Sequence, residues 1–525
     1  MRQVLPLVLL APALAGCSLI YNPNNLPAAG SITDAEIILD ADPSKLELDG
    51  VAPGSINEGQ GDGNSALALV VINGHQIVDA NTTVELAPSA DTPMPAGAMM
   101  PTIVGAPVIA KDGNWIALQI AAHVDPMLGD GQLIKLDIRV SQDVKATPGV
   151  RNTQTLTGKL TLRGLPELVI AAGTTAVPLD TGTLKPLYSM IDLEAPVTFT
   201  GANRAILRAT SSITTKALTA DGKPGGDAAA ASPWVGGCGG GGQSAQGLCS
   251  GGTGGQSSGL NGGGGGGGGF ATDGMAGKPP SNGSPGVQTG DELIVSYDGS
   301  VGKANKSEGG GGGGPATLLG LGLTRGGAGG GGGGAIELTA DGDVTVGGAI
   351  SAKGGAGEKT GAGGGGGGAG GLVMLRAGHA LSAPSGIVVS GGPGGATSGS
   401  NGAGGDGAAG RVRWDAVTGD APAAVTAGSF RRGPAFSLGA YVLRDNKPSF
   451  TVVGSSNTRF TVYTTNFDVD GHQNTTVGGV QQIDGGSATF SQVLQQGLTK
   501  LCLTLEGGAS NTPEADKCVL VAFLP

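Results

Sequence analysis

Oxygen-bearing side chains at alternate positions form the strongest candidate metal site in the sequence, with Asp40, Asp42 and Ser44 as a similar but weaker set. Asn466, Asp468 and Asp470 stand just before Gly471. Calcium loops place carboxylate and amide oxygens in this way around a glycine turn. Position twelve of such a loop would be Val477, where a bidentate acid is expected. The segment therefore predicts a polar loop between strands, with calcium binding as the alternative.

Side chains typical of catalysis are scattered along the chain. The four histidines, His75, His123, His379 and His472, have no metal-ligand partner at the neighbouring spacings that zinc sites use. Gly255–Gly259 matches the Gly-x-Ser-x-Gly pattern of serine hydrolases, which requires a buried strand before the serine and a helix after it. Glycine, serine and threonine precede it here. We therefore predict a non-catalytic protein without a resident cofactor.

The first residues have the layout of a secretory signal. Arg2 supplies a positive charge, and the apolar run from Val4 to Ala15 is shorter than the roughly 20 residues of a membrane-spanning helix. Leu14-Ala15-Gly16-Cys17 resembles the lipobox of bacterial lipoproteins, in which the cysteine is acylated and becomes the first residue. An ordinary signal peptide with a cysteine nearby is the alternative. The resemblance implies a signal over residues 1–16, lipid on Cys17 and a tether over 17–34.

The residue after the cysteine bears on location. In lipoproteins of this kind an aspartate there retains the protein in the inner membrane, and this chain has Ser18. The resemblance therefore implies a secreted protein held in the envelope, at the outer membrane where the cell has two membranes. Each buried CH₂ of the acyl chains would contribute about 0.8 kcal/mol to anchoring.

Four cysteines remain once Cys17 is assigned to lipid. In an oxidising compartment an even number predicts disulfides, and proximity favours the pairs Cys238–Cys249 and Cys502–Cys518. Each bond would contribute roughly 3 kcal/mol in the loop-entropy model. A four-cysteine zinc site is the alternative, but the sequence lacks the Cys-x-x-Cys pair typical of one.

Composition excludes some functions. The formal net charge is −11 and basic residues do not cluster, which argues against nucleic acid as a partner. Aromatic residues make up 3% of the chain, too few for a carbohydrate platform of stacked rings. A length of 525 residues predicts about three domains.

Short alternating segments fill residues 35–165. Their spacing and the lack of a helical period predict an antiparallel sandwich. The turn Pro53–Gly59, followed by an aliphatic segment that ends in Gly74, resembles the immunoglobulin-like domains of the IPT/TIG kind. The resemblance implies an immunoglobulin-like fold for this region.

Glycine dominates residues 166–416, and by count residues 221–410 hold 73 of the 105 glycines. Such a segment is a flexible coil unless something orders it. Apolar residues between the runs recur, however: Leu375, Ala377, Gly391 and Gly392 follow Leu338, Ala340, Gly354 and Gly355 at a constant interval, and Ala205–Ala209 begins a fainter copy. Repeats of this kind predict a solenoid in which each unit covers its neighbour.

The unbroken glycine runs, at 262–269, 309–314, 329–334 and 363–368, have similar lengths. As polyproline-II helices they would span about 19–25 Å and could pack side by side through N–H···O bonds and weaker Cα–H···O contacts. In composition and run length they resemble the glycine-rich domains of anaplastic-lymphoma-kinase-type receptors and of some phage tail-fibre adhesins. We predict an ordered bundle, with flexible linkers as the alternative.

Residues 430–525 return to alternating strands, and 501–505 with 518–523 would form a hairpin joined by the Cys502–Cys518 bond. The complete prediction is an all-β chain, with immunoglobulin-like sandwiches flanking a glycine-rich, solenoid-like β-repeat that contains polyglycine II helices. For its function we expect a lipid-anchored surface protein with an adhesion or scaffold role and a protein or surface-polymer ligand. A purely structural spacer and an envelope enzyme with an unrecognised site are the alternatives.

Overall fold

Every regular element that the structure describes is a β-strand, so the all-β prediction is confirmed. The structure is a computed structural model. It describes residues 46–525 except 79–80, 126–127, 144–149, 227–234, 236, 238–239, 242–251, 255–262, 280–282, 288–325, 399–400, 420–421, 439–440, 468–472 and 506–517.

Two sheets pack face to face at the front of the described chain, because their apolar side chains alternate with polar ones. The core between them is aliphatic, with Ile72, Leu118 and Leu136 almost fully buried. One sheet has the order β1 (Glu47–Ala52), β3 (Ala68–His75), β7 (Trp115–Ala121), β5 (Thr102–Ile103), with β6 (Val108–Ile109) also on β7. The other has the order β2 (Ser55–Asn57), β9 (Arg151–Arg163), β8 (Leu133–Asp143), β4 (Thr83–Pro88).

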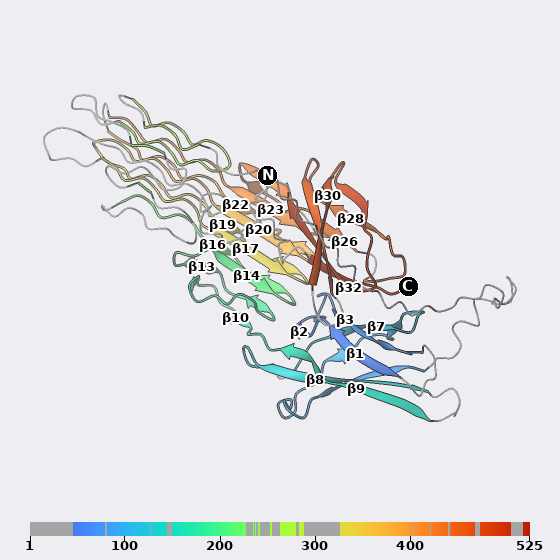
Figure 1. The fold of residues 1–525 in the computed structure, drawn as a ribbon. Coiled ribbons are helices and arrows are strands. Elements are labelled where there is room, and N and C mark those ends of the chain that lie inside the picture. Colours follow the sequence, from blue (N-terminus) through green and yellow to red (C-terminus); the bar gives the residue numbers. More distant parts are fainter. Residues whose placement is uncertain are drawn as a thin grey trace, which may run out of the picture. The chain divides into compact units, whose positions relative to one another are not determined.

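Three parallel sheets follow, each built from strands of successive coils (Figure 1). The first contains β10 (Leu168–Ile170), β12 (Ile191–Leu193), β15 (Ile213–Thr215), β18 (Val344–Val346) and β21 (Leu381–Ser382). The second contains β11 (Val177–Asp180), β13 (Val197–Thr200), β16 (Leu218–Thr219), β19 (Ile350–Ser351), β22 (Ile387–Val388) and β24 (Val425–Thr426). The third contains β14 (Ala205–Ala209), β17 (Ala335–Ala340), β20 (Leu372–Ala377), β23 (Arg411–Asp415) and β25 (Ser429–Arg432).

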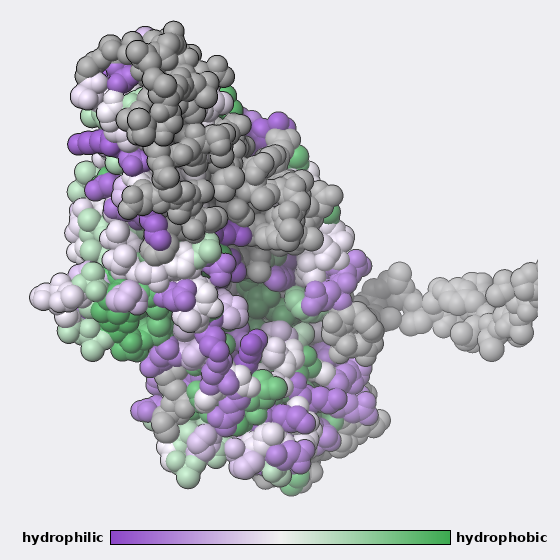
Figure 2. Space-filling view, turned by 90° about the vertical axis from the view of Figure 1, so that its left-hand side faces the viewer, coloured by the Kyte–Doolittle hydropathy of each residue, from purple (hydrophilic) through white to green (hydrophobic). Residues whose placement is uncertain are grey.

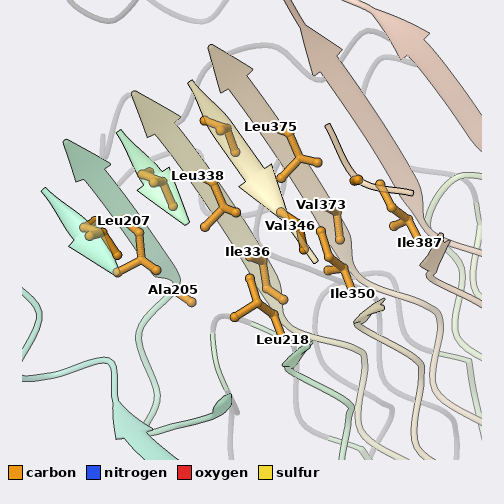
Figure 3. Close-up of a cluster of buried hydrophobic side chains, with 14 of the residues drawn as sticks. Ala205, Leu207, Leu218, Ile336, Leu338, Val346, Ile350, Val373, Leu375 and Ile387 are labelled. Atoms are coloured by element: carbon orange, nitrogen blue, oxygen red, sulfur yellow. The ribbon is translucent and has the colours of Figure 1, made fainter. Parts of the chain in front are cut away.

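The chain visits the three sheets in turn, which makes this region a solenoid. Equivalent side chains stack in its interior: Leu207 pairs with Leu338, Leu338 with Leu375, and Leu375 with Trp414. Figure 3 shows Leu207, Leu338 and Leu375 between the sheets. The repeat predicted from Leu338 and Leu375 is therefore the pairing of β17 with β20. The parallel ladder continues past residue 416 to Arg432 in β25.

The glycine-rich segments leave the solenoid between the second and third sheets (Figure 1). In three of the coils one segment runs outward and another returns, and we call these segments arms. The outward arms are 220–226, 352–358 and 389–395, and the return arms are 326–334, 363–371 and 402–410. A further piece, 263–269, lies against the return arms, where the Gly265 amide donates to the Gly364 carbonyl at 2.9 Å.

Hydrogen bonds between arms recur at every third residue. Three amides of the first return arm donate to the second at 2.8–2.9 Å, and three of the second donate to the third over the same distances: Gly327, Gly330 and Gly333 to Gly363, Gly366 and Ala369, then Gly364, Gly367 and Gly370 to Gly402, Gly405 and Ala408. A period of three is that of polyproline II, which has no hydrogen bonds within its own helix. The described glycine runs are therefore packed as an ordered bundle, as the run lengths predicted.

Two further sheets close the chain. The smaller has the order β26 (Ala435–Ser437), β28 (Ser449–Val453), β31 (Ser487–Ser491). The larger has the order β27 (Val442–Leu443), β33 (Cys518–Phe523), β32 (Gly497–Leu505), β29 (Arg459–Phe467), β30 (Gln473–Gln482). Phe450, Phe460 and Phe490 lie in the core between them. The outer face of the larger sheet packs on β3 and β7, where Leu498 and Ala522 join Leu69 in one buried cluster.

Candidate functional site

Most residues that the sequence marked as sites lie outside the described residues. These are Cys17, Cys238, Cys249, Asp468 and Asp470. Lipidation, the first disulfide and the calcium loop therefore stay predictions. Asn466 is described: it is buried near the end of β29, and its Oδ1 accepts a hydrogen bond of 2.8 Å from the Thr499 hydroxyl.

Cys502 and Cys518 form a disulfide, as their proximity in the sequence predicted. They lie opposite each other where the antiparallel strands β32 and β33 pair. The predicted hairpin of 501–505 with 518–523 is thus present, and the bond joins its two strands near the end where the chain passes from β32 to β33.

Each described histidine contacts a single carboxylate near the surface. His75 Nε2 is 3.3 Å from Asp49 Oδ2, and His123 Nδ1 is 3.7 Å from Asp62 Oδ2. His379 Nδ1 is 2.7 Å from Asp343 Oδ1. Among the described residues no group of three or more His, Cys, Asp or Glu side chains is placed to hold a metal ion.

Asp343 links the solenoid to the front sandwich. Burial would raise the pKa of its carboxyl, but hydrogen bonds from Asn64, His379 and the Ala380 amide outweigh burial, and the pKa falls below its ordinary value. Asn64 Nδ2 donates at 2.8 Å across the junction. The ionised carboxylate is therefore the form that accepts these hydrogen bonds and so connects Asn64 of the front sandwich to the starts of β18 and β21.

Charged side chains that the sequence reading missed are buried on the outward face of the third sheet. Asp415 accepts from Arg413 Nε at 2.8 Å, and its second oxygen lies 2.7 Å from Arg413 Nη2 and 3.2 Å from Arg376 Nε. Glu337 on the neighbouring β17 lies 3.1 Å from Arg208 Nη2. Removing either partner of such a pair would destabilise the protein, because the remaining buried charge would have no opposite charge beside it.

A signal for this cluster was available. Arg208, Thr339, Arg376 and Asp415 occupy the same position of successive strands and pair in register. Aligning the copies on all their residues, rather than on the apolar and glycine positions, would have stacked these polar side chains in one row.

A cleft of about 570 Å³ opens where the front sandwich, the solenoid and the last two sheets meet. Its walls include Gln60 and Gln119 from the front, Asp341 and His379 from the solenoid, and Phe436 and Tyr441 from the last sheets. Burial, and then the charge of Asp341, raise the pKa of the Tyr441 phenol, so the phenol keeps its proton. Amides, a carboxylate and two rings can hold a polar ligand that has apolar faces. Of the site residues predicted from the sequence, Cys518 lines this cleft. Asn466 and its hydrogen-bond partner Thr499 do not.

The outward arms present a second surface. Exposed residues recur at intervals of three or six along two of these arms and just beyond their ends: Lys353 and Lys359 on one, and Pro393 and Ala396 on the next. Neighbouring arms are bonded in register, because the Gly354 amide donates to the Ser390 carbonyl at 2.9 Å. On the face drawn in Figure 2, hydrophobic residues form small separate patches among hydrophilic ones.

Comparisons with known proteins give no identification: no protein-family model, curated protein or solved structure matches this chain. Within the described part of the chain we find no apolar helix with the length that a membrane span requires.

Proposed function

We propose that this chain is a lipid-anchored protein of a bacterial cell envelope, placed at the outer membrane, with a non-catalytic role in adhesion or scaffolding. The observation that carries the proposal is the packing of the glycine arms. Their amides and carbonyls bond from arm to arm at every third residue, so the outward arms hold their side chains in a fixed array.

The array has a regular spacing. Three residues of polyproline II rise about 9.3 Å, which is the distance between successive outward side chains of one arm. Lys353, Ala356 and Lys359 follow this period. A surface that is already ordered loses little conformational entropy on binding, and its period suits a ligand with repeated units, such as a surface polymer.

Sequence features support the rest of the proposal. Leu14–Cys17 supplies the lipobox-like segment, and two acyl chains hold a protein on a membrane. The two-sheet sandwich of β1–β9 supports an IPT/TIG-like front domain, a kind of module that binds partners or separates other domains.

Charge reversal on one arm tests adhesion against a passive spacer. Beads coated with the full chain carrying Cys17→Ser, so that no lipid interferes, are offered to intact bacterial cells and to purified envelope polysaccharide. The double variant Lys353→Glu, Lys359→Glu should reduce bead retention about tenfold, which corresponds to roughly 1.4 kcal/mol. The matched control Lys111→Glu, Lys447→Glu makes the same charge change at exposed lysines away from the arms.

The outcomes separate the two roles. Retention lost in the arm variant and kept in the control supports adhesion through the arms. Beads that never bind, with either variant or without one, overturn adhesion and leave the spacer role.

The anchor has its own test. Cells fed radiolabelled palmitate should label the wild-type chain and leave Cys17→Ala unlabelled, and the variant should leave the membrane fraction. An unlabelled wild-type chain would overturn the anchor, whatever the bead experiment gives.

A further inference from the structure

Strand β30 is the last strand of the larger sheet among the strands that the structure describes. In the described part of the chain it pairs only with β29, and eight of its ten residues are exposed. Its sequence, Gln-Asn-Thr-Thr-Val-Gly-Gly-Val-Gln-Gln, contains no charged residue and no proline. The unpaired N–H and C=O groups of such an edge are a template for another strand.

Three other edge strands carry charged residues or a proline. β1 has Glu47 and Asp49 near its start, β4 has Glu85 and ends at Pro88, and β25 contains Arg431 and Arg432. Charges and prolines on an edge oppose pairing with a second chain. β30 is thus an uncharged, ten-residue edge in a chain whose net charge is −11.

The centre of β30 has the same sequence in both directions. Val477-Gly478-Gly479-Val480 reads identically backwards. The register against β29 shifts here, with Tyr463 opposite Val477 and Thr461 opposite Val480. Because Tyr463 and Thr461 are two apart and share a face, both valines lie on that face. They are 63% and 47% exposed.

We propose that two copies of this chain join through β30 in an antiparallel pair, with the two-fold axis between Gly478 and Gly479. The two larger sheets would then form one continuous sheet. Val477 would lie opposite Val480 of the partner subunit, and the four valines would cover one another on a single face. A symmetric pair requires such a self-complementary patch.

Charge favours a second copy as the occupant. Like charges placed opposite each other destabilise a strand pair, and in this highly acidic chain β30 brings none to the contact. The contact is small, so we expect a weak dimer that depends on concentration. The proposal does not depend on the lipid anchor or on adhesion by the arms.

Cysteine pairing tests the register directly. Because the axis lies between two residues, no residue of β30 faces its own copy. Full chains with Cys17→Ser and either Val477→Cys or Val480→Cys should each give little cross-linked dimer under mild oxidation, whereas their mixture should give a prominent one on a non-reducing gel. The parent chain, run beside them, accounts for the native cysteines.

The results are decisive for this register. A mixture that cross-links no more than the separate variants would overturn the proposal, provided that a maleimide labels both new thiols. Equal cross-linking of Val477→Cys alone would overturn the stated axis.

Sedimentation equilibrium gives an independent measurement. At concentrations up to about 0.1 mM the parent chain should approach twice the mass of one chain. Val477→Lys should lower the association constant about tenfold or more, because a charge enters the strand pair. The control Val493→Lys changes a valine that is 61% exposed and lies outside β30. A monomeric parent chain, or equal effects of the two lysines, would contradict the proposal.

Discussion

The solenoid interior and the glycine arms are built from the same coils, yet they exclude water in opposite ways. Between the sheets, Leu207, Leu338 and Leu375 fill the space with side-chain volume. Between the arms there are almost no side chains, and backbone oxygens of one arm occupy the space where a neighbour's Cβ would be. The interior requires apolar side chains of the right volume, whereas the arms require that side chains are absent.

The arms differ in how strictly they exclude side chains. A Cβ on any of the five glycines 364–368 would lie 1.9–2.0 Å from a carbonyl oxygen of another arm. Because the helix turns once in three residues, these contacts face three different neighbours. The outward arms 352–358 and 389–395 have one free direction, and there every third residue, such as Lys353 and Ala356, is not glycine. An unbroken run therefore marks an arm surrounded by others, and a Gly-Gly-x pattern marks one at the surface.

Gly366→Ala should give the largest effect. Its Cβ would lie 2.0 Å from the Gly266 oxygen and 2.5 Å from the Gly266 carbonyl carbon, and a backbone cannot move aside as a side chain can. We expect a loss of about 5 kcal/mol or local unfolding of the bundle. Hydrogen exchange of the amides in 327–334 and 363–371 measures it. Exchange as slow as in the wild-type protein would mean that the arms are less tightly packed than their hydrogen bonds indicate.

Leu338→Ala should have the next largest effect, by the opposite mechanism. The side chain is fully buried between two equivalent leucines, so truncation leaves a cavity and costs about 3 kcal/mol. The shift of the urea midpoint measures the loss, with Thr345→Ala as control because Thr345 in β18 is exposed. Equal shifts for the two variants would show that the interior does not depend on aliphatic packing.

These two regions also differ in how far the sequence predicted them. The period linking Leu338 to Leu375 follows from residue types, since strands that stack must repeat. The run lengths predicted ordered polyglycine because they match a helix that spans a fixed distance. The sequence did not predict which arms lie inside the bundle. Glycine has no side chain that could mark an inner or outer face, and only the spacing of the non-glycine residues marks one.

The candidate site was predicted less well than the fold. The Cys502–Cys518 bond follows from sequence proximity, and the alternation of the flanking strands gives their faces. The Asp415 cluster and the cleft are assembled from segments far apart in sequence: Gln60 and Tyr441 line one cavity although they belong to opposite ends of the described chain. Local sequence patterns do not predict contacts between such distant segments. These contacts depend on how the solenoid packs against both sandwiches.

A smaller, pH-dependent effect should arise at Glu58, a buried side chain of the front sandwich. Its oxygens accept hydrogen bonds from the Leu128 and Leu165 amides at 3.0 and 3.1 Å. Burial nevertheless raises the pKa of this carboxyl above its ordinary value of 4.5. The folded protein therefore holds a proton that the unfolded chain has already lost, and this contribution to stability declines as the pH rises from 4.5 through the raised pKa.

Urea midpoints measured between the two pKa values test this sign. Glu58→Gln should flatten the fall of stability with rising pH, because no proton is released on unfolding. Glu85→Gln, at an exposed glutamate of β4, should leave the slope unchanged. A steeper fall in Glu58→Gln than in the wild-type protein would contradict the assignment.

Gly226→Ala should have the smallest effect, although it is the same substitution as Gly366→Ala in the same kind of arm. Gly226 is exposed, and a Cβ there would meet nothing within 4 Å. Alanine also restricts the unfolded chain more than glycine does, so the variant should be unchanged or more stable by about 0.4–1 kcal/mol. Hydrogen exchange and the urea midpoint, compared directly with Gly366→Ala, measure the contrast. If both alanines destabilised the arms equally, glycine would be required for its backbone freedom and not for the space between arms, and the distinction between inner and outer arms would fail.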